Sequence, residues 1–204
     1  MDLLSPIPLA AEDELRRPEL QEALVRELFQ RSRSALVLLT LVLPLLWQVL
    51  GEGATQDPRV PWLFGLLLLN IVGRLGVVFW LDRLPEVLRG PTALHLLFLA
   101  GSTMAGACFG ALNAVALPHM DPLRVCLLAV CHTGINSFAM VSMAGSITAY
   151  LLYMVPNLAA FAWALARYPM PEAGPLLLGL ILFYLFSLVV LSLRVHRGLV
   201  ESIL

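Results

Sequence analysis

Long hydrophobic runs separated by short polar stretches make up most of this chain, and each run is long enough to cross a bilayer core of about 30 Å as a helix. The run Val125–Ala166 holds 42 residues without a charge. As one helix it would be roughly 63 Å long, so it must cross twice, with a turn near Ser142–Ser146. The pattern predicts six membrane spans: Ser34–Leu50, Pro61–Leu81, Ala93–Leu117, two within Val125–Ala166, and Leu176–Leu193.

A different pattern precedes the first run. Leucines recur every four residues from Leu20 to Leu28, and Glu22 and Arg26 are spaced as a helical ion pair. We expect a short amphipathic helix over Glu19–Arg33, lying at the membrane surface. The expected organisation is a cytoplasmic N-terminal segment (1–33), a six-helix transmembrane domain (34–193) and the start of a cytoplasmic linker helix (194–204).

Composition supports the membrane interpretation. Hydrophobic residues make up 59% of the chain and charged residues 13%, with a mean hydropathy of +0.85, whereas a soluble domain carries roughly 25% charged residues. The predicted fold class is therefore an all-α polytopic membrane bundle in contact with the lipid bilayer. The net charge of −1 and the lack of a basic patch argue against nucleic-acid binding.

Arginine placement orients the predicted spans. Six spans put both termini on one side of the membrane, together with nine of the thirteen basic residues, all of which are arginine. Three arginines fall on the other side, and Arg74 lies inside the second span. Because cytoplasmic loops carry the excess of basic residues, both termini are expected in the cytoplasm. The loops on the outer side are short, so a ligand site is expected inside the bundle.

Arg74 is the most informative candidate, because charges within a membrane are costly and usually functional. Asn70 lies one turn away on the same helix face, and no Asp or Glu lies within any predicted span. One interpretation is that Arg74 binds an anion such as the carboxylate of a fatty-acid-like signal. The other is a structural role, in which Arg74 reaches toward the cytoplasmic interface, backbone carbonyls or Asp82.

Other polar and small residues are also candidates for binding or packing. His132 and Asn136 share a face of the fourth span, and Asn157 lies in the fifth; in lipid such groups seek one another, either lining a pocket or joining helices. Gly106 and Gly110 form a small-xxx-small motif that favours close helix packing, within the bundle or at a dimer seam. The residues suggest no metal site and no catalytic set.

The segment Arg194–Leu204 reads RVHRGLVESIL. It resembles the junction after the last span of bacterial six-span membrane sensors, where a basic stretch begins the helical linker to a histidine kinase or a diguanylate cyclase. The layout of the whole chain is similar as well, above all to sensor kinases for diffusible fatty-acid signals. The resemblance implies the membrane region of a sensor (hybrid) histidine kinase, located in the bacterial inner membrane as a homodimer.

The resemblance places Arg194, His196 and Arg197 where the signal leaves the membrane. It implies ATP and Mg²⁺ for a kinase part after Leu204, and a cognate response regulator as partner; no cofactor is expected within the 204 residues. His196 lacks the pattern of a phospho-accepting histidine.

The leading hypothesis is a receptor in which a small lipophilic ligand contacts the bundle's polar residues and shifts the last helix. The alternatives are a diguanylate cyclase sensor, a small transporter or channel, or a structural anchor that dimerises a cytoplasmic enzyme.

Overall fold

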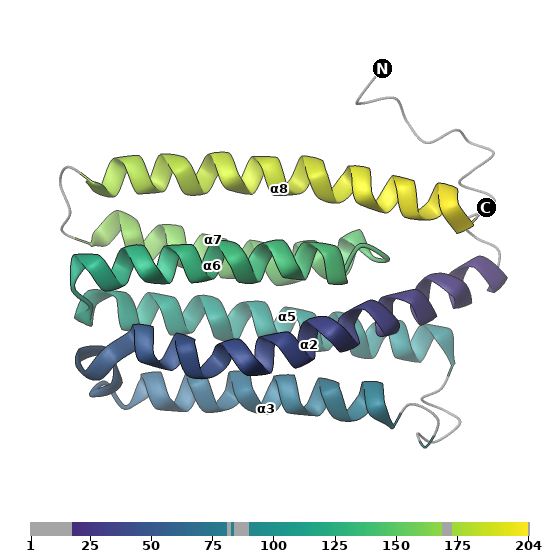
Figure 1. Cartoon of the computed structure of the whole chain (residues 1–204), viewed down its shortest axis with the longest axis horizontal. Helices are drawn as coiled ribbons and strands as arrows, with labels where there is room; N and C mark the ends of the chain where they lie inside the picture. The colour runs from purple at the N-terminus through teal and green to yellow at the C-terminus, as the bar shows by residue number, and fades with distance from the viewer. Residues whose placement is uncertain (1–17, 81–82, 84–89, 169–172, 204) are drawn as a thin grey trace.

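The computed structural model describes residues 18–80, 83, 90–168 and 173–203, and these contain no strand. Six long helices pack lengthwise, and each is long and apolar enough to cross a membrane, which confirms the predicted all-α bundle (Figure 1). The helices are α2 (Pro18–Thr55), α3 (Arg59–Phe79), α5 (Pro91–Ala116), α6 (Pro122–Ser142), α7 (Ile147–Arg167) and α8 (Ala173–Ile203), with a short 3-10 turn η2 (Leu117–His119) after α5.

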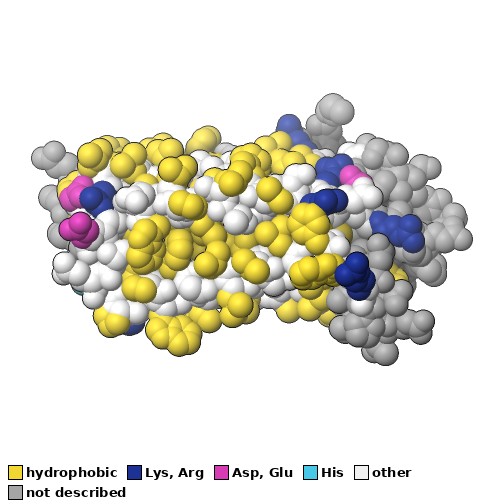
Figure 2. All heavy atoms as spheres, turned by 60° about the horizontal axis from the view of Figure 1, so that its bottom comes forward, with side chains coloured by type: hydrophobic (Ala, Val, Ile, Leu, Met, Phe, Trp, Pro, Cys, Tyr) yellow, Lys and Arg dark blue, Asp and Glu magenta, His cyan; other side chains and the backbone are white. Residues whose placement is uncertain are grey.

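Consecutive helices run in opposite directions, so the start of α2, the α6–α7 turn and the end of α8 lie at one end of the bundle (Figure 1). We call this the termini end, and the other the opposite end. Both ends of the described chain therefore lie at the same end of the bundle, as an even number of antiparallel helices requires. In the face shown in Figure 2, charged side chains gather toward the two ends, and hydrophobic side chains cover the surface between them.

The charge-free run divides where the sequence predicts. Helix α6 ends at Ser142 and α7 begins at Ile147. Ser146 caps α7 by accepting a hydrogen bond from the backbone N–H of Ala149 at 3.2 Å, which satisfies one of the free donors of the first helical turn. Asp121 caps α6 in the same way, accepting from the Arg124 backbone N–H at 3.0 Å.

The structure does not show a separate amphipathic helix over Glu19–Arg33. Pro18 begins a helix that runs without interruption through this segment and the first span to Leu50; Gly51, at φ 71°, breaks the helical geometry before α2 ends at Thr55. Phe29, in the middle of the segment, packs edge-to-face with Phe98 of α5, with 5.7 Å between ring centroids. Of the leucines expected at the membrane surface, Leu28 is buried in the core of the bundle, together with Val25 and Phe29.

Helices α5 and α7 make the closest contact in the bundle. A Cβ placed on Gly106 would lie 2.0 Å from the backbone oxygen of Tyr153, and one on Gly110 would lie 2.7 Å from that of Pro156. The two glycines therefore let α5 approach the α7 backbone directly, which any side chain would prevent. The small-xxx-small motif packs within the chain and centres the bundle on α5, which also contacts α2 and α3.

Helix α8 lies at the edge of the bundle and contacts chiefly α7 and α6 (Figure 1). Leu188 and Ser192 are its buried side chains among those described, and seven of its large apolar side chains are exposed. The helix continues without a break from the predicted span through Arg194 to Ile203.

Substituting Gly106 with Ala should destabilise the bundle, because the new methyl group collides with a backbone carbonyl that cannot rotate away. We expect a loss near the upper end of the roughly 1–3 kcal/mol typical of overpacking. Unfolding in sodium dodecyl sulfate followed by circular dichroism measures it. Gly65→Ala is the matched control, because its Cβ meets no atom within 4 Å; equal losses in the two variants would contradict the packing argument.

Candidate functional site

Arg74 lies in α3 and extends across α5. Its guanidinium carbon stands 4.8 Å from the centre of the Phe98 ring, a geometry in which the ring face attracts a cation. Gly101 makes room for it, since a Cβ there would lie 3.1 Å from Cδ of Arg74. The arginine is therefore held against α5 and within the apolar part of the bundle.

Two cavities meet at Arg74. The first cavity, of about 220 Å³, is lined mainly by α2 and α6, with Tyr153 of α7. The second cavity, of about 360 Å³, lies among α2, α3 and α5 and includes Asn70 and Phe98. Arg74 and Leu36 line both cavities. Both are lined largely by apolar side chains, so the guanidinium is the strongest polar group at their junction.

No described carboxylate lies within ion-pair distance of Arg74; Asp82, the acidic partner considered from the sequence, is outside the described residues. Ser32, which also lines both cavities, donates its hydroxyl to its own helix, to the backbone oxygen of Leu28 at 2.7 Å. The Asn70 side-chain oxygen has no partner. Arg74 therefore offers its guanidinium donors to an anion that enters either cavity.

The other predicted polar residues form a separate network in the core. Asn136 donates to the backbone oxygen of His132 at 2.8 Å, and Asn157 donates to the side-chain oxygen of Asn136 at 3.2 Å, which joins α6 to α7. All three are fully or almost fully buried. The structure thus brings these residues together through one hydrogen bond within α6 and one between α6 and α7, and none of the three lines the cavities at Arg74.

Asn113 completes this network, although the sequence analysis did not single it out. Its side-chain nitrogen lies 3.0 Å from Nδ1 of His132, and the His132 ring is stacked between Phe109 and Phe161, with centroids 5.2 and 4.5 Å away. Asn113 sits three residues after Gly110, on the face of α5 that packs inward. The spacing of Asn113 from Gly110 could have shown in the sequence that Asn113 lies on the inward face of α5.

Tyr153 connects the network to the first cavity. It accepts a long hydrogen bond of 3.5 Å from Asn157, and it lines the cavity together with Arg74. Several buried oxygens and nitrogens near this path have no partner, including Oδ1 of Asn157 and Nε2 of His132. A change in the cavity can therefore reach the polar core through one side chain.

The last helix is tied to α6 by hydrogen bonds. Tyr184 donates to the backbone oxygen of Thr133 at 2.6 Å, so Ser137, 2.7 Å away, donates to the tyrosine oxygen. Near the termini end, Nδ1 of His196 lies 2.8 Å from the backbone oxygen of Ala144. Of the basic residues expected at the signal output, His196 thus contacts the α6–α7 turn, Arg194 is exposed and Arg197 is half-buried.

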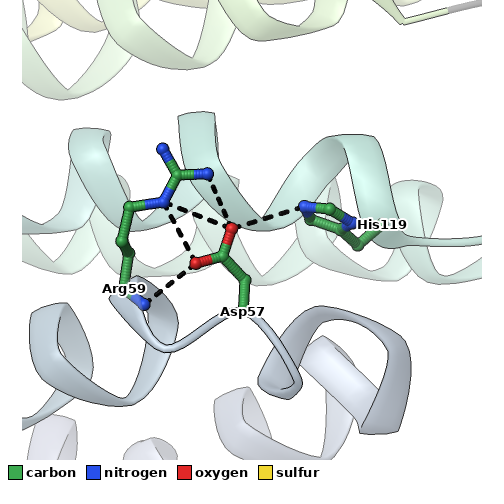
Figure 3. A network of polar contacts seen from close by, with 3 residues as sticks. All are labelled: Asp57, Arg59 and His119. Atoms are coloured by element: carbon green, nitrogen blue, oxygen red, sulfur yellow. Dashed lines mark hydrogen bonds and ion pairs between the residues drawn. The ribbon is translucent and has the colours of Figure 1, made fainter.

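A third polar cluster lies at the opposite end (Figure 3). Asp57, between α2 and α3, accepts from the Arg59 side chain at 2.7 Å and from its backbone N–H at 2.9 Å, and His119 of η2 approaches the same carboxylate at 3.5 Å. The hydrogen bonds from Arg59 lower the pKa of Asp57 from 3.8 to about 2. The cluster joins the α2–α3 turn to the end of α5.

Comparison with protein-family models, curated proteins and solved structures finds no match to this chain. Within the described residues, no group of three or more His, Cys, Asp or Glu could hold a metal ion.

The Asn136–Asn157 bond should show coupling in a double-mutant cycle. Replacing each with Leu, singly and together, should cost less in combination than the sum of the single losses, by about 0.6 kcal/mol, as is typical of hydrogen bonds between membrane helices. The measurement is unfolding free energy in detergent. Thr133→Val combined with Asn157→Leu is the control and should be additive, because Thr133 bonds its own helix through the Ala129 oxygen.

The Asp57 carboxyl should titrate near pH 2, and Arg59→Gln should bring its pKa back toward 3.8, because the side-chain hydrogen bond is the main cause of the shift. Since the folded pKa is depressed, the stabilisation is complete above pH 3.8 and is lost as pH falls toward 2. Carbon-13 NMR of the Asp57 carboxyl measures both pKa values. A titration near 3.8 in the unsubstituted protein would exclude this ion pair.

Proposed function

We propose that this chain is a membrane input module that binds a small lipophilic anion, such as a fatty-acid-like signal, at Arg74 and transmits the binding through α8. The observation that carries the proposal is the position of Arg74 at the junction of two apolar cavities, without a described carboxylate within ion-pair distance. A guanidinium in such surroundings favours an anionic partner, because the alternative is an uncompensated charge in an apolar region.

The cavities define the chemical class of the ligand. Their walls are mainly aliphatic and aromatic, and together with Arg74 they suit a hydrocarbon chain that ends in an anionic group. Each cavity approaches or falls within the size of a small-molecule pocket, roughly 300–1,000 Å³. A bidentate contact between guanidinium and carboxylate adds affinity and orientation. Asn70 lines the second cavity beside Arg74 and supplies a further polar contact.

The proposal also includes the signalling activity to which the membrane module is connected. The resemblance of Arg194–Leu204 to sensor junctions favours a sensor histidine kinase that acts as a homodimer on a cognate response regulator, using ATP and Mg²⁺; a diguanylate cyclase is the second choice. The excess of arginine on the side of both termini supports cytoplasmic ends in a bacterial inner membrane. The unbroken α8 offers a continuous connection from the bundle to such an output.

Arg74→Leu should weaken binding of dodecanoate at least about tenfold, since a hydrogen bond to a charged group contributes roughly 1.5–3 kcal/mol. The protein is reconstituted in lipid nanodiscs, and binding of radiolabelled dodecanoate is measured at equilibrium. Dodecanol, which has the same chain without the charge, should bind the unsubstituted protein weakly and should not respond to the substitution.

Arg33→Leu is the matched control. Arg33 also stacks on an aromatic ring, that of Phe79 at 4.4 Å, but it lines neither cavity, so its loss should leave dodecanoate binding unchanged. Equal binding of dodecanoate by the Arg74→Leu variant would reject the site. Net transport of dodecanoate by the purified chain in liposomes would favour the transporter alternative, and binding of neither probe would favour a structural anchor.

A further inference from the structure

The proposed ligand site and the last helix share one structural element, α6. Gly134 and Phe138 of α6 line the first cavity. The neighbouring residues Thr133 and Ser137 hold Tyr184 of α8 by hydrogen bonds of 2.6 and 2.7 Å. The residues that line the cavity and the residues that bond α8 thus lie on the same two turns of α6. A displacement of these turns would change both the cavity and the contact with α8.

The same relation recurs near the termini end. Ser142 and Met143, where α6 ends, line the first cavity. The next residue, Ala144, accepts from Nδ1 of His196 through its backbone oxygen at 2.8 Å. We call the Tyr184 contacts the mid-helix latch and the His196 contact the end latch.

Helix α8 lies at the edge of the bundle, and the latches are its hydrogen bonds to α6 and to the α6–α7 turn. Its main packing partner is α7, and its contacts with α6 are sparse. Leu188 packs into the core, with Ile181 and Leu185 against it, whereas Phe183 and Phe186 are exposed at 70% and 68%. The latches therefore add to this apolar packing the hydrogen bonds that hold α8 in one position relative to α6.

We infer that occupancy of the first cavity regulates α8 by displacing α6 and opening the two latches. The inference rests on the proposed function, because it assigns to the same site its means of regulation. The latched arrangement is the resting state, and the ligand binds more tightly to the state in which α6 has moved outward. Differential affinity for two states is what allows a ligand to shift the equilibrium between them.

Linkage gives the inference a second, independent signature. If the latches oppose the ligand-bound state, weakening a latch must tighten ligand binding by the factor through which the ligand weakens the latch. Tyr184→Phe removes the hydroxyl and retains the ring, so it opens the mid-helix latch with little change in packing. The expected result is a dodecanoate Kd at least about fivefold lower than that of the unsubstituted protein.

The movement itself is measured by electron–electron double resonance in nanodiscs. Spin labels are placed at Val141 of α6 and Leu193 of α8, both exposed, after Cys108, Cys126 and Cys131 are replaced with Ser. Dodecanoate should shift the distance distribution of the labelled parent protein, and dodecanol should not. Tyr184→Phe in the same background should show the shifted distribution before any dodecanoate is added.

Ser187→Ala is the matched control on α8. The Ser187 hydroxyl bonds its own helix, at the Phe183 oxygen, so its removal should leave both the distances and the Kd unchanged. Tight dodecanoate binding with no distance change, or an unchanged Kd in Tyr184→Phe, would overturn the latch mechanism while leaving the proposed function intact. Absence of dodecanoate binding to the unsubstituted protein would instead remove the proposed function, and the inference with it.

Discussion

The direct contact between the α5 and α7 backbones is the constraint on which the rest of the bundle depends. With glycine at positions 106 and 110, the two helices approach until Tyr153 and Pro156 carbonyls lie against α5. The same approach puts inward-facing polar groups of α5, α6 and α7 within hydrogen-bond reach, so packing and polar pairing reinforce each other. In a bilayer, where apolar side chains gain little from leaving lipid for protein, such close packing is a main source of helix association.

The surroundings of Arg74 differ from those of the polar residues in the core network. The amides of α6 and α7 find one another, and the His132 ring is enclosed by two phenyl rings. The guanidinium, in contrast, stands against the Phe98 ring at the junction of two largely apolar cavities, with no described carboxylate within ion-pair distance. This contrast separates the structural polar groups of the bundle from the group best suited to meet a ligand.

The hydrophobic pattern predicted six membrane spans and the turn between α6 and α7. It could do so because the bilayer sets how long a span must be and where charged residues can lie. It did not predict that the helix beginning at Pro18 would continue into the first span, because an amphipathic face can pack on lipid headgroups or on a neighbouring helix with the same pattern. The convergence of His132, Asn136 and Asn157 followed from the scarcity of polar groups in lipid. The cavities, the role of Asn113 and the α8 contacts depend on helix rotation and register, which one sequence does not determine.

The core network also dictates an order of assembly. Asn113 enters the membrane with α5, whereas its partner His132 belongs to α6 and the next member, Asn157, belongs to α7. During synthesis the Asn113 amide therefore has no partner until α6 has been made, and Asn136 of α6 has no interhelical partner until α7 follows. Helix α8 arrives last, after the hydrogen bonds among α5, α6 and α7 can already have formed, and it adds to the edge of the bundle.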